Sequence, residues 1–441
     1  MRQLKHFLIA MLVPGLWHSA AGLAATDDWE SWNAKFQTTY VLQSKAAFGA
    51  LYSGQNSLST AKEGSYSFTA TAAFGYRPWA GGELYFDPEL AQGVPLSNLT
   101  GLGGFSNGEI ARVTGHTPKL YRARLFLRQT WGLGGAREAV ESDMNQLASS
   151  VDKRRLVVTA GNLSVLDIFG DNSYSHDPRT QFLNWALMTH GAFDYAADAR
   201  GYSWGVAAEY YRDDWTLRAG RFIQPRQPNQ LSLDPRILQH YGDQIEFEHR
   251  HELRGQPGAV RVLLFRNRVR MSRFADAQSF AAANGGVPDL DPVRSSERIK
   301  YGAGINIEQQ LARDVGAFAR ASWADGQTET YAFTEIDNSI SAGALVKGAA
   351  WGRAQDAVGL ALLQNGLSRA RRNYLAAGGM GFFIGDGALR YRPENIVETY
   401  YNWNVAKQSW ATLDFQRTVN PAYNADRGPV SIASLRLHFE F

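Results

Sequence analysis

The last seven residues of the chain alternate strictly between apolar and ionisable side chains. In LRLHFEF, from Leu435 to Phe441, every odd-numbered residue is apolar and every even-numbered residue can carry a charge. This period of two predicts a β-strand with one apolar face and one wet face. A strand with this pattern that ends on Phe441 is typical of the closing strand of an outer-membrane β-barrel.

The same alternation recurs along the chain, for example in residues 202–210 and 301–308. Small and charged residues occupy one face of these segments, which predicts a wet interior. We therefore predict an all-β fold, a transmembrane antiparallel β-barrel of about 16 strands with short helices in inward-folded loops. The predicted strands are 36–44, 64–77, 82–88, 119–131, 154–165, 202–211, 215–222, 240–252, 259–267, 297–310, 315–323, 338–351, 357–367, 394–405, 410–419 and 430–441.

Short, turn-like connectors alternate with long ones between these strands, as expected for periplasmic turns and external loops. An even number of strands places both termini on the periplasmic side. The connector 132–153 is an exception. The alternation of connectors along the chain places it on the periplasmic side, where a short turn is expected, but it is long. Within it, Ala136 to Ser150 predicts a short helix followed by a polar link.

The first 24 residues have the pattern of an export signal. Arg2 and Lys5 precede a short apolar stretch, and small residues end at Ala24. We predict cleavage after Ala24, which leaves residues 25–441 as a single outer-membrane barrel domain. The chain has no cysteine, so no disulfide stabilises the exported protein.

Composition excludes two other classes of protein. Lys and Arg number 45 against 42 Asp and Glu, so no bulk positive field is available to hold nucleic acid. No apolar run approaches the ~18 residues of a membrane-spanning helix. We expect no nucleic-acid partner, no metal and no cofactor.

Strand parity predicts which charged side chains enter the lumen. In the strand 119–131, Arg122, Arg124 and Arg128 would form an inward ladder. Near-balance of inward acids and bases argues against a pore that selects strongly for one sign of charge, and favours hydroxyl-rich neutral solutes. The plainer alternative is that these charges pair with each other and only solvate the wall. The same parity places further candidates inside: Arg218, Glu246, Arg320, Glu398 and Asp414.

The long connector 166–201 predicts a loop with its own helix. Asp177 is a suitable N-cap, Pro178 suits the first helical position, and Gly191 can end the helix. A loop that carries an apolar stripe is expected to fold into the barrel, where Asp177 and Arg179 would narrow the pore. A cap over the barrel rim is the alternative. Glu109, in the preceding long connector, is predicted to accept hydrogen bonds from a solute.

Several stretches are similar to the carbohydrate-selective porin family, the OprB-like glucose porins of Gram-negative bacteria. They are GELYFDPELAQG (82–93), GFSNGE (104–109), RLFLRQTWGLGG (124–135), NSYSHDPRTQFLNWALMTHGAFDYAADARGYSWG (172–205), ETYYNWNV (398–405) and NPAYNADRGPVSIASLRLHFEF (420–441).

This resemblance covers nearly all of the mature chain. Ser106 departs from it, because proline is expected at that position. The family implies a sixteen-stranded outer-membrane barrel that passes sugars by diffusion, with charged residues and inward loops at the constriction. Its implied partners are sugars, outer-membrane lipid and the assembly machinery that reads the C-terminal strand, with a possible homotrimer.

The predicted function is passive diffusion of monosaccharides or small oligosaccharides. A general or anion-preferring porin is the first alternative, favoured if the arginine ladder stands unpaired. A barrel-based hydrolase with His176 as base is a second, although side chains at Ser175, His176 and Asp177 diverge because they are contiguous. An adhesive barrel with active external loops is a third.

Overall fold

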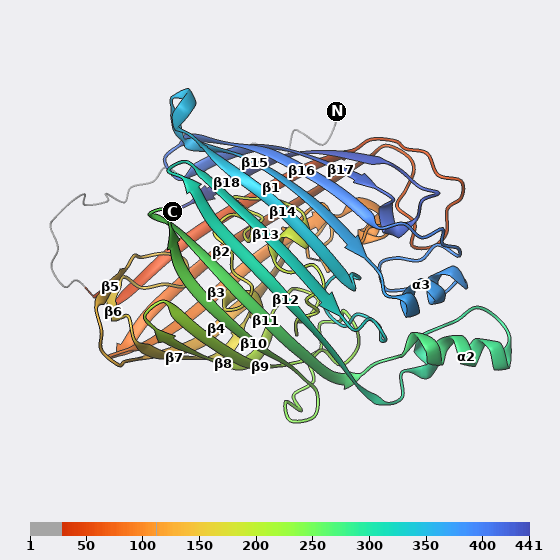
Figure 1. Ribbon diagram of the computed structural model, residues 1–441, viewed down its shortest axis with the longest axis horizontal. Coiled ribbons are helices and arrows are strands. Elements are labelled where there is room, and N and C mark those ends of the chain that lie inside the picture. The colour runs from red at the N-terminus through yellow and green to blue at the C-terminus, as the bar shows by residue number, and fades with distance from the viewer. Residues whose placement is uncertain (1–28, 112) are drawn as a thin grey trace.

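The computed structural model describes residues 29–111 and 113–441, so the predicted signal peptide of residues 1–24 lies outside the described residues. Sixteen strands close into one antiparallel barrel, and β1 (Trp32–Lys45) pairs with β18 (Val430–Glu440) to seal it (Figure 1). The predicted fold class is therefore confirmed. No helix in the described ranges is long and apolar enough to cross a bilayer.

The barrel strands follow each other around the wall in chain order, with only β5 and β6 outside it. They are β2 (Glu63–Trp79), β3 (Gly82–Val94), β4 (Lys119–Gly132), β7 (Arg155–Leu163), β8 (Ser203–Arg212), β9 (Trp215–Ile223), β10 (Tyr241–Leu253), β11 (Gln256–Arg270), β12 (Glu297–Ala312), β13 (Val315–Ala324), β14 (Asn338–Gly348), β15 (Arg353–Gly366), β16 (Glu394–Ala406) and β17 (Ser409–Val419).

Short turns lie at one end of the barrel and long loops at the other. The C-terminus lies at the end with the short turns, whereas α2 (Phe274–Asn284) and α3 (Arg369–Ala376) extend the loops at the opposite end (Figure 1). In barrels of this kind the turns are periplasmic and the long loops are extracellular. The 3₁₀ turns are η2 (Leu96–Leu99), η3 (Val165–Asp167), η4 (Asp291–Val293), η5 (Ala349–Trp351) and η6 (Pro421–Tyr423).

The predicted helix in the connector 132–153 is wrong. The segment forms a hairpin, β5 (Arg137–Val140) paired with β6 (Ser149–Asp152). Gly134 and Gly135 both have positive φ, which turns the chain back so that Leu133 can bond to the carbonyl of Arg154. Continuing the ladder between β4 and β7 thus overrides the local helix propensity.

The loop between β7 and β8, residues 164–202, folds into the barrel and is called the inward loop below. Its helix is shorter than predicted: α1 covers only Trp185–Met188, with Asn184 as N-cap. Asp177 does cap a turn, but the backbone N–H groups of Leu183 and Asn184 bond to Glu398 on the wall. Those contacts divert the chain before a longer helix can form.

The inward loop brings an apolar core into the lumen. Phe182 and Phe193 pack against wall residues such as Phe318 and Phe265. A Cβ on Gly304 would lie 2.5 Å from the Nδ1 atom of His190, so this inward glycine makes room for the loop. The small inward residues that predicted a wet interior therefore serve in part to seat the loop.

Candidate functional site: a charged cavity inside the barrel

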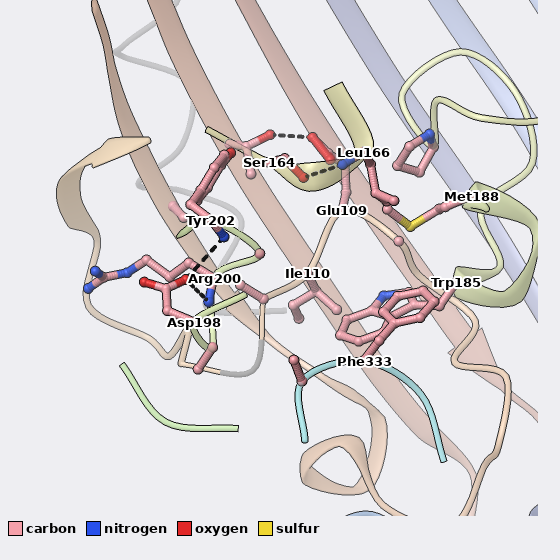
Figure 2. Close-up of a pocket in the computed structure, with 18 of the residues that line it drawn as sticks. Glu109, Ile110, Ser164, Leu166, Trp185, Met188, Asp198, Arg200, Tyr202 and Phe333 are labelled. Atoms are coloured by element: carbon pink, nitrogen blue, oxygen red, sulfur yellow. Dashed lines mark hydrogen bonds between the residues drawn. The ribbon is translucent and has the colours of Figure 1, made fainter. Parts of the chain in front are cut away.

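A cavity of about 320 Å³ remains where the inward loop meets β2, β3, β4 and the β3–β4 loop, residues 95–118 (Figure 2). Charged side chains and tyrosine rings lie on one side of it, and Trp185 and Phe333 lie on the other. Its charged and aromatic lining includes Glu89, Glu109, Tyr121, Arg124, Asp167, Asp177, Arg179, Trp185, Tyr195, Tyr202 and Phe333.

The first charged group joins the inward loop to the β3–β4 loop. The Nε atom of Arg179 donates to Glu109 at 2.5 Å, and its Nη2 atom lies 3.6 Å from Glu89. Thr69 also donates to Glu109, at 2.9 Å, and the Tyr121 hydroxyl donates to Glu89. Burial alone would lower the pKa of Arg179, but Glu109 and Glu89 raise it overall. The guanidinium therefore carries a permanent charge in the cavity.

Asp177 supports that arginine from within the loop. Its carboxylate accepts from the backbone N–H of Arg179 at 3.0 Å and from the Thr180 hydroxyl at 3.0 Å. Burial acts to raise the pKa of Asp177, but Arg179 and these hydrogen bonds hold it below its usual value. Asp177 is thus ionised at neutral pH and fixes the turn that presents Arg179.

The second charged group is centred on Arg124 of β4. Its guanidinium makes two hydrogen bonds of 2.7 Å to Asp167 and lies 3.4 Å from Asp87. Asp167 is positioned by a capping box with Ser164 at the start of η3. The ring of Tyr202 lies 5.3 Å from the Arg124 guanidinium. This forked pair is rigid because both partners are held by other contacts.

Aromatic rings form the facing wall. Trp185 stacks on Phe333 with ring centroids 5.8 Å apart and planes within 3°. The Trp185 indole N–H donates to the carbonyl of Asn107 at 2.6 Å, which fixes the ring orientation. A flat apolar surface opposite charged donors and acceptors suits a ligand with an apolar face and a polar rim.

Four of the eleven residues predicted to line the pore line this cavity: Glu109, Arg124, Asp177 and Arg179. Arg128 also points inward from β4 but lies outside the cavity lining. It donates to the carbonyl of Asn145 at 3.0 Å and covers the ring of Tyr85. Arg128 therefore ties the wall to the connector that contains β5 and β6.

Arg122 does not point into the lumen, which corrects its predicted place in the ladder. The pairing of β3 with β4 slips at this point, because Asp87 faces Arg124 and Pro88 faces Arg122. Ala123 is left as a bulge, and Pro88 has no N–H to continue the ladder. Arg122 consequently lies on the outer face, 5.0 Å from the ring of Trp204.

Arg218, Glu246 and Arg320 are inward but lie behind the inward loop. Arg218 bonds to Glu246 at 3.1 Å, and Glu246 accepts from the backbone N–H of Gly170 at 2.8 Å. Arg320 donates to the carbonyl of Leu187 at 2.8 Å. These charges hold the loop against the wall.

Glu398 and Asp414 are covered by the same loop. Glu398 accepts from the N–H groups of Leu183 and Asn184 at 2.5 and 3.1 Å. Asp414 accepts from Gln416 at 3.3 Å and Ser434 at 3.4 Å. The prediction from strand parity gives their direction but not the loop that covers them.

Sequence reasoning missed several cavity residues, and three of them carried a signal. Leu84 and Phe86 face outward, so the same alternation continued past Pro88 places Glu89 inside. Ser164 and Asp167 have the spacing of a capping box. Tyr121 and Tyr202 reach the cavity through local backbone irregularities that no periodicity predicts.

A closed sixteen-stranded barrel, narrowed by an inward loop to a charged cavity, defines an outer-membrane porin. The chain belongs to the carbohydrate-selective porin family, OprB, whose family model matches residues 55–441. It is therefore an outer-membrane porin for sugar diffusion, as predicted from the resemblance. No curated protein sequence matches the chain.

Solved structures show the same fold. The high-pH structure of Pseudomonas putida OprB is 16% identical with a TM-score of 0.70, over 93% of this chain and 94% of that one. The Acinetobacter baumannii channel DcaP is 9% identical with a TM-score of 0.50, over 95% and 100% of the two chains. A. baumannii OccAB1 is 10% identical with a TM-score of 0.50, over 94% and 97%.

Proposed function

We propose that monosaccharides and small oligosaccharides cross the barrel through the cavity between the two arginine centres and the aromatic wall. The observation that carries this proposal is that Arg124 and Arg179, each held by carboxylates, lie opposite Trp185 in one cavity. Its volume of about 320 Å³ is within the range of small-ligand sites. Forked donors and carboxylate acceptors match sugar hydroxyls, and the stacked rings match the apolar face of a pyranose.

Passage by diffusion requires no catalytic step and no cofactor. The contacts of the predicted hydrolase residues give that alternative no support. The Ser175 hydroxyl donates to the carbonyl of Leu187 at 2.7 Å, and the Nδ1 atom of His176 lies 2.9 Å from the carbonyl of Met188. Both side chains are thus engaged with backbone groups instead of each other, and we propose that the protein is not an enzyme.

The pairing of both arginines also bears on ion selectivity. A general or anion-preferring porin would be favoured by arginines that stand unpaired at the narrowest point. Arg124 has two carboxylates within 3.4 Å, and Arg179 has two within 3.6 Å. Neither arginine therefore stands unpaired as a site for anions, which argues against an anion-preferring porin.

Single-channel conductance in planar bilayers with a series of glucose concentrations tests the proposal. Replacing Arg124 with Ala removes charged donors worth about 1.5–3 kcal/mol each, so glucose block should weaken by at least about tenfold. Arg128→Ala is the matched control, since Arg128 points inward from the same strand outside the cavity lining. Absence of glucose block in the unmodified channel would contradict the sugar assignment.

The remaining partners are proposals of the same kind. We propose that β18 is read by the outer-membrane assembly machinery and that the outer face contacts lipid. Cleavage after Ala24, a single barrel domain over residues 25–441, and a homotrimer stay predictions.

A further inference from the structure

A second hollow lies on the outer face of the barrel near its extracellular end, where β4 and β7 part. β7 pairs with β4 only as far as Asn162 opposite Leu125, so residues 119–124 of β4 pair with β3 alone. The loops before β8 and β10 border the gap and leave a groove of about 520 Å³. Its lining comprises Tyr121, Arg122, Asn162, Asp198, Arg200, Tyr202, Trp204, Ile223, Arg226, Leu231, Leu233 and Pro235.

Three arginines converge on this groove with one carboxylate, Asp198. Arg122 lies 5.0 Å from the ring of Trp204, and Arg200 lies 4.4 Å from the ring of Tyr121. The Nε atom of Arg226 makes a long hydrogen bond of 3.4 Å to the carbonyl of Leu233. Within residues 29–111 and 113–441, none of the three forms an ion pair.

The Asp198 carboxylate is already committed to the backbone. It accepts from the N–H groups of Arg200 at 2.9 Å and Tyr202 at 3.2 Å. The guanidinium of Arg200 runs away from Glu109 and Trp185, towards the outside of the cavity (Figure 2). With three guanidinium groups against this one carboxylate, the groove carries a net positive charge.

Nearby arginines on the same outer face differ in this respect. Arg221 and Arg266 share the carboxylate of Asp243, each at 2.6 Å, and Arg268 bonds to Glu297 at 2.5 Å. These three guanidinium groups are paired with carboxylates, whereas the three in the groove are not paired with any carboxylate of the described residues.

The groove lies at the depth of the lipid headgroups. Trp204 is 39% exposed on the outer face, and Tyr301 packs against Trp323 further around the barrel. Exposed aromatic rings of this kind mark the interface between hydrocarbon and headgroups in a membrane barrel. Leu120, 73% exposed, and the groove residue Leu231 add apolar surface beside the arginines.

The unpaired edge of β4 also favours a lipid headgroup at this position. Backbone groups of residues 119–124 that face the gap have no neighbouring strand, and acyl chains offer them no hydrogen bonds. The side chain of Asn162 satisfies one of them, the carbonyl of Ala123, at 2.7 Å. Among the others, N–H groups can donate to a phosphate and carbonyl groups can accept from sugar hydroxyls, whereas a hydrocarbon tail can do neither.

We propose that this groove binds the phosphate of a phosphorylated glycolipid of the outer leaflet, a role beyond the proposed sugar pathway. Guanidinium groups of Arg122, Arg200 and Arg226 donate in forks to phosphate oxygens. The sugar ring of the headgroup lies along Trp204, and its acyl chains follow the apolar surface of Leu231. Basic recesses at the membrane surface recognise lipid headgroups in this way.

The test measures binding of bisphosphorylated lipid A and of enzymatically dephosphorylated lipid A to the refolded full chain in detergent micelles, by native mass spectrometry. The wild type should prefer the phosphorylated lipid by about tenfold or more, and R122Q combined with R226Q should abolish that preference. R221Q is the matched control, because Arg221 is half-buried on the same face but paired with Asp243. Its affinity should stay within about twofold of wild type.

Equal binding of both lipids by the wild type overturns the proposal, as does an unchanged preference in the double variant. Full displacement of lipid A by millimolar inorganic phosphate also overturns it, since the groove would then hold a small anion. R226Q alone provides a second variant whose folding is not at risk, because Arg226 lies in the loop before β10. It should lower affinity for the phosphorylated lipid about tenfold and leave the dephosphorylated lipid unaffected.

Discussion

The Arg179 guanidinium lies 2.5 Å from the Glu109 carboxylate, and the two residues come from different loops that meet inside the barrel. The Arg179 side chain is 19% exposed and that of Glu109 is 6% exposed. Because Arg179 also lies 3.6 Å from Glu89, one cation contacts two carboxylates. This arrangement makes the charge of the cavity sensitive to a single side chain.

Replacing Arg179 with Gln should leave Glu89 and Glu109 without their cation. Preference for potassium over chloride should rise, and glucose block should weaken by about tenfold, since one charged donor contributes at least about 1.5 kcal/mol. Reversal potentials in a salt gradient and a glucose series measure both effects. Arg250→Gln is the control, because Arg250 is paired with Glu248 away from the cavity. Unchanged selectivity in R179Q would remove this pair from the conduction path.

Replacing Glu398 with Ala should release the inward loop. The N–H groups of Leu183 and Asn184 lose their acceptor, so unfolding free energy should fall by about 3 kcal/mol and open-channel conductance should rise. Urea unfolding in micelles and single-channel recording measure the two changes. Val397→Ala, on the outer face of the same strand, should leave conductance unchanged. Wild-type conductance in E398A would show that the loop is held without this contact.

The sequence predicted the barrel well because strand alternation is a local property. Every one of the sixteen predicted strands overlaps an observed one, and the alternation from Leu435 to Phe441 lies in the strand that closes the barrel. Long-range contacts caused the errors. The helix expected at 136–150 is a hairpin, and the helix expected from Asp177 is diverted by bonds to Glu398.

The site was predicted only in part for the same reason. Parity placed Arg124 correctly in the lumen, but one bulged residue, Ala123, turned Arg122 to the outer face. Pro88, on the neighbouring strand, was the sequence signal of that irregularity. Which inward charges stay open and which the loop covers, as it covers Glu398, depends on tertiary packing that no single segment encodes.

A bulky residue at Gly304 should displace the inward loop. A Cβ there would lie 2.5 Å from a ring atom of His190, so Gly304→Val should cost about 1–3 kcal/mol of unfolding free energy. Ala303→Val is the control, because Ala303 faces outward between the same strands. Urea unfolding in micelles measures both variants. Equal stability of the two would mean that the loop does not press on this part of the wall.

The outer face of β11 should tolerate charge only near its ends. Val262 is 41% exposed among apolar neighbours, so Val262→Arg should destabilise the barrel by about 2–4 kcal/mol in lipid. Gln256→Arg, at the turn end of the same strand, should cost about 0–1 kcal/mol. Denaturant titration of both variants in vesicles provides the comparison, and equal losses would contradict the membrane position assigned to the strand.

His190 should make the protein sensitive to acid. Burial lowers the pKa of His190 from its ordinary value of 6.5 to about 3, with a smaller contribution from Arg320. Between about pH 6.5 and pH 3, His190 is protonated in the unfolded chain but stays neutral in the folded barrel. Stability should therefore fall by about 1.4 kcal/mol per pH unit from pH 6.5 until the folded state also titrates near pH 3.

His190→Gln should remove this part of the pH dependence, because glutamine does not titrate. Unfolding free energies from urea titrations at pH 7 and pH 4 measure the difference, with the exposed His116→Gln as control. His116→Gln should lose as much stability on acidification as the wild type, whereas H190Q should lose less by about 3 kcal/mol. If all three proteins lose the same unfolding free energy between pH 7 and pH 4, protonation of His190 does not destabilise the folded barrel.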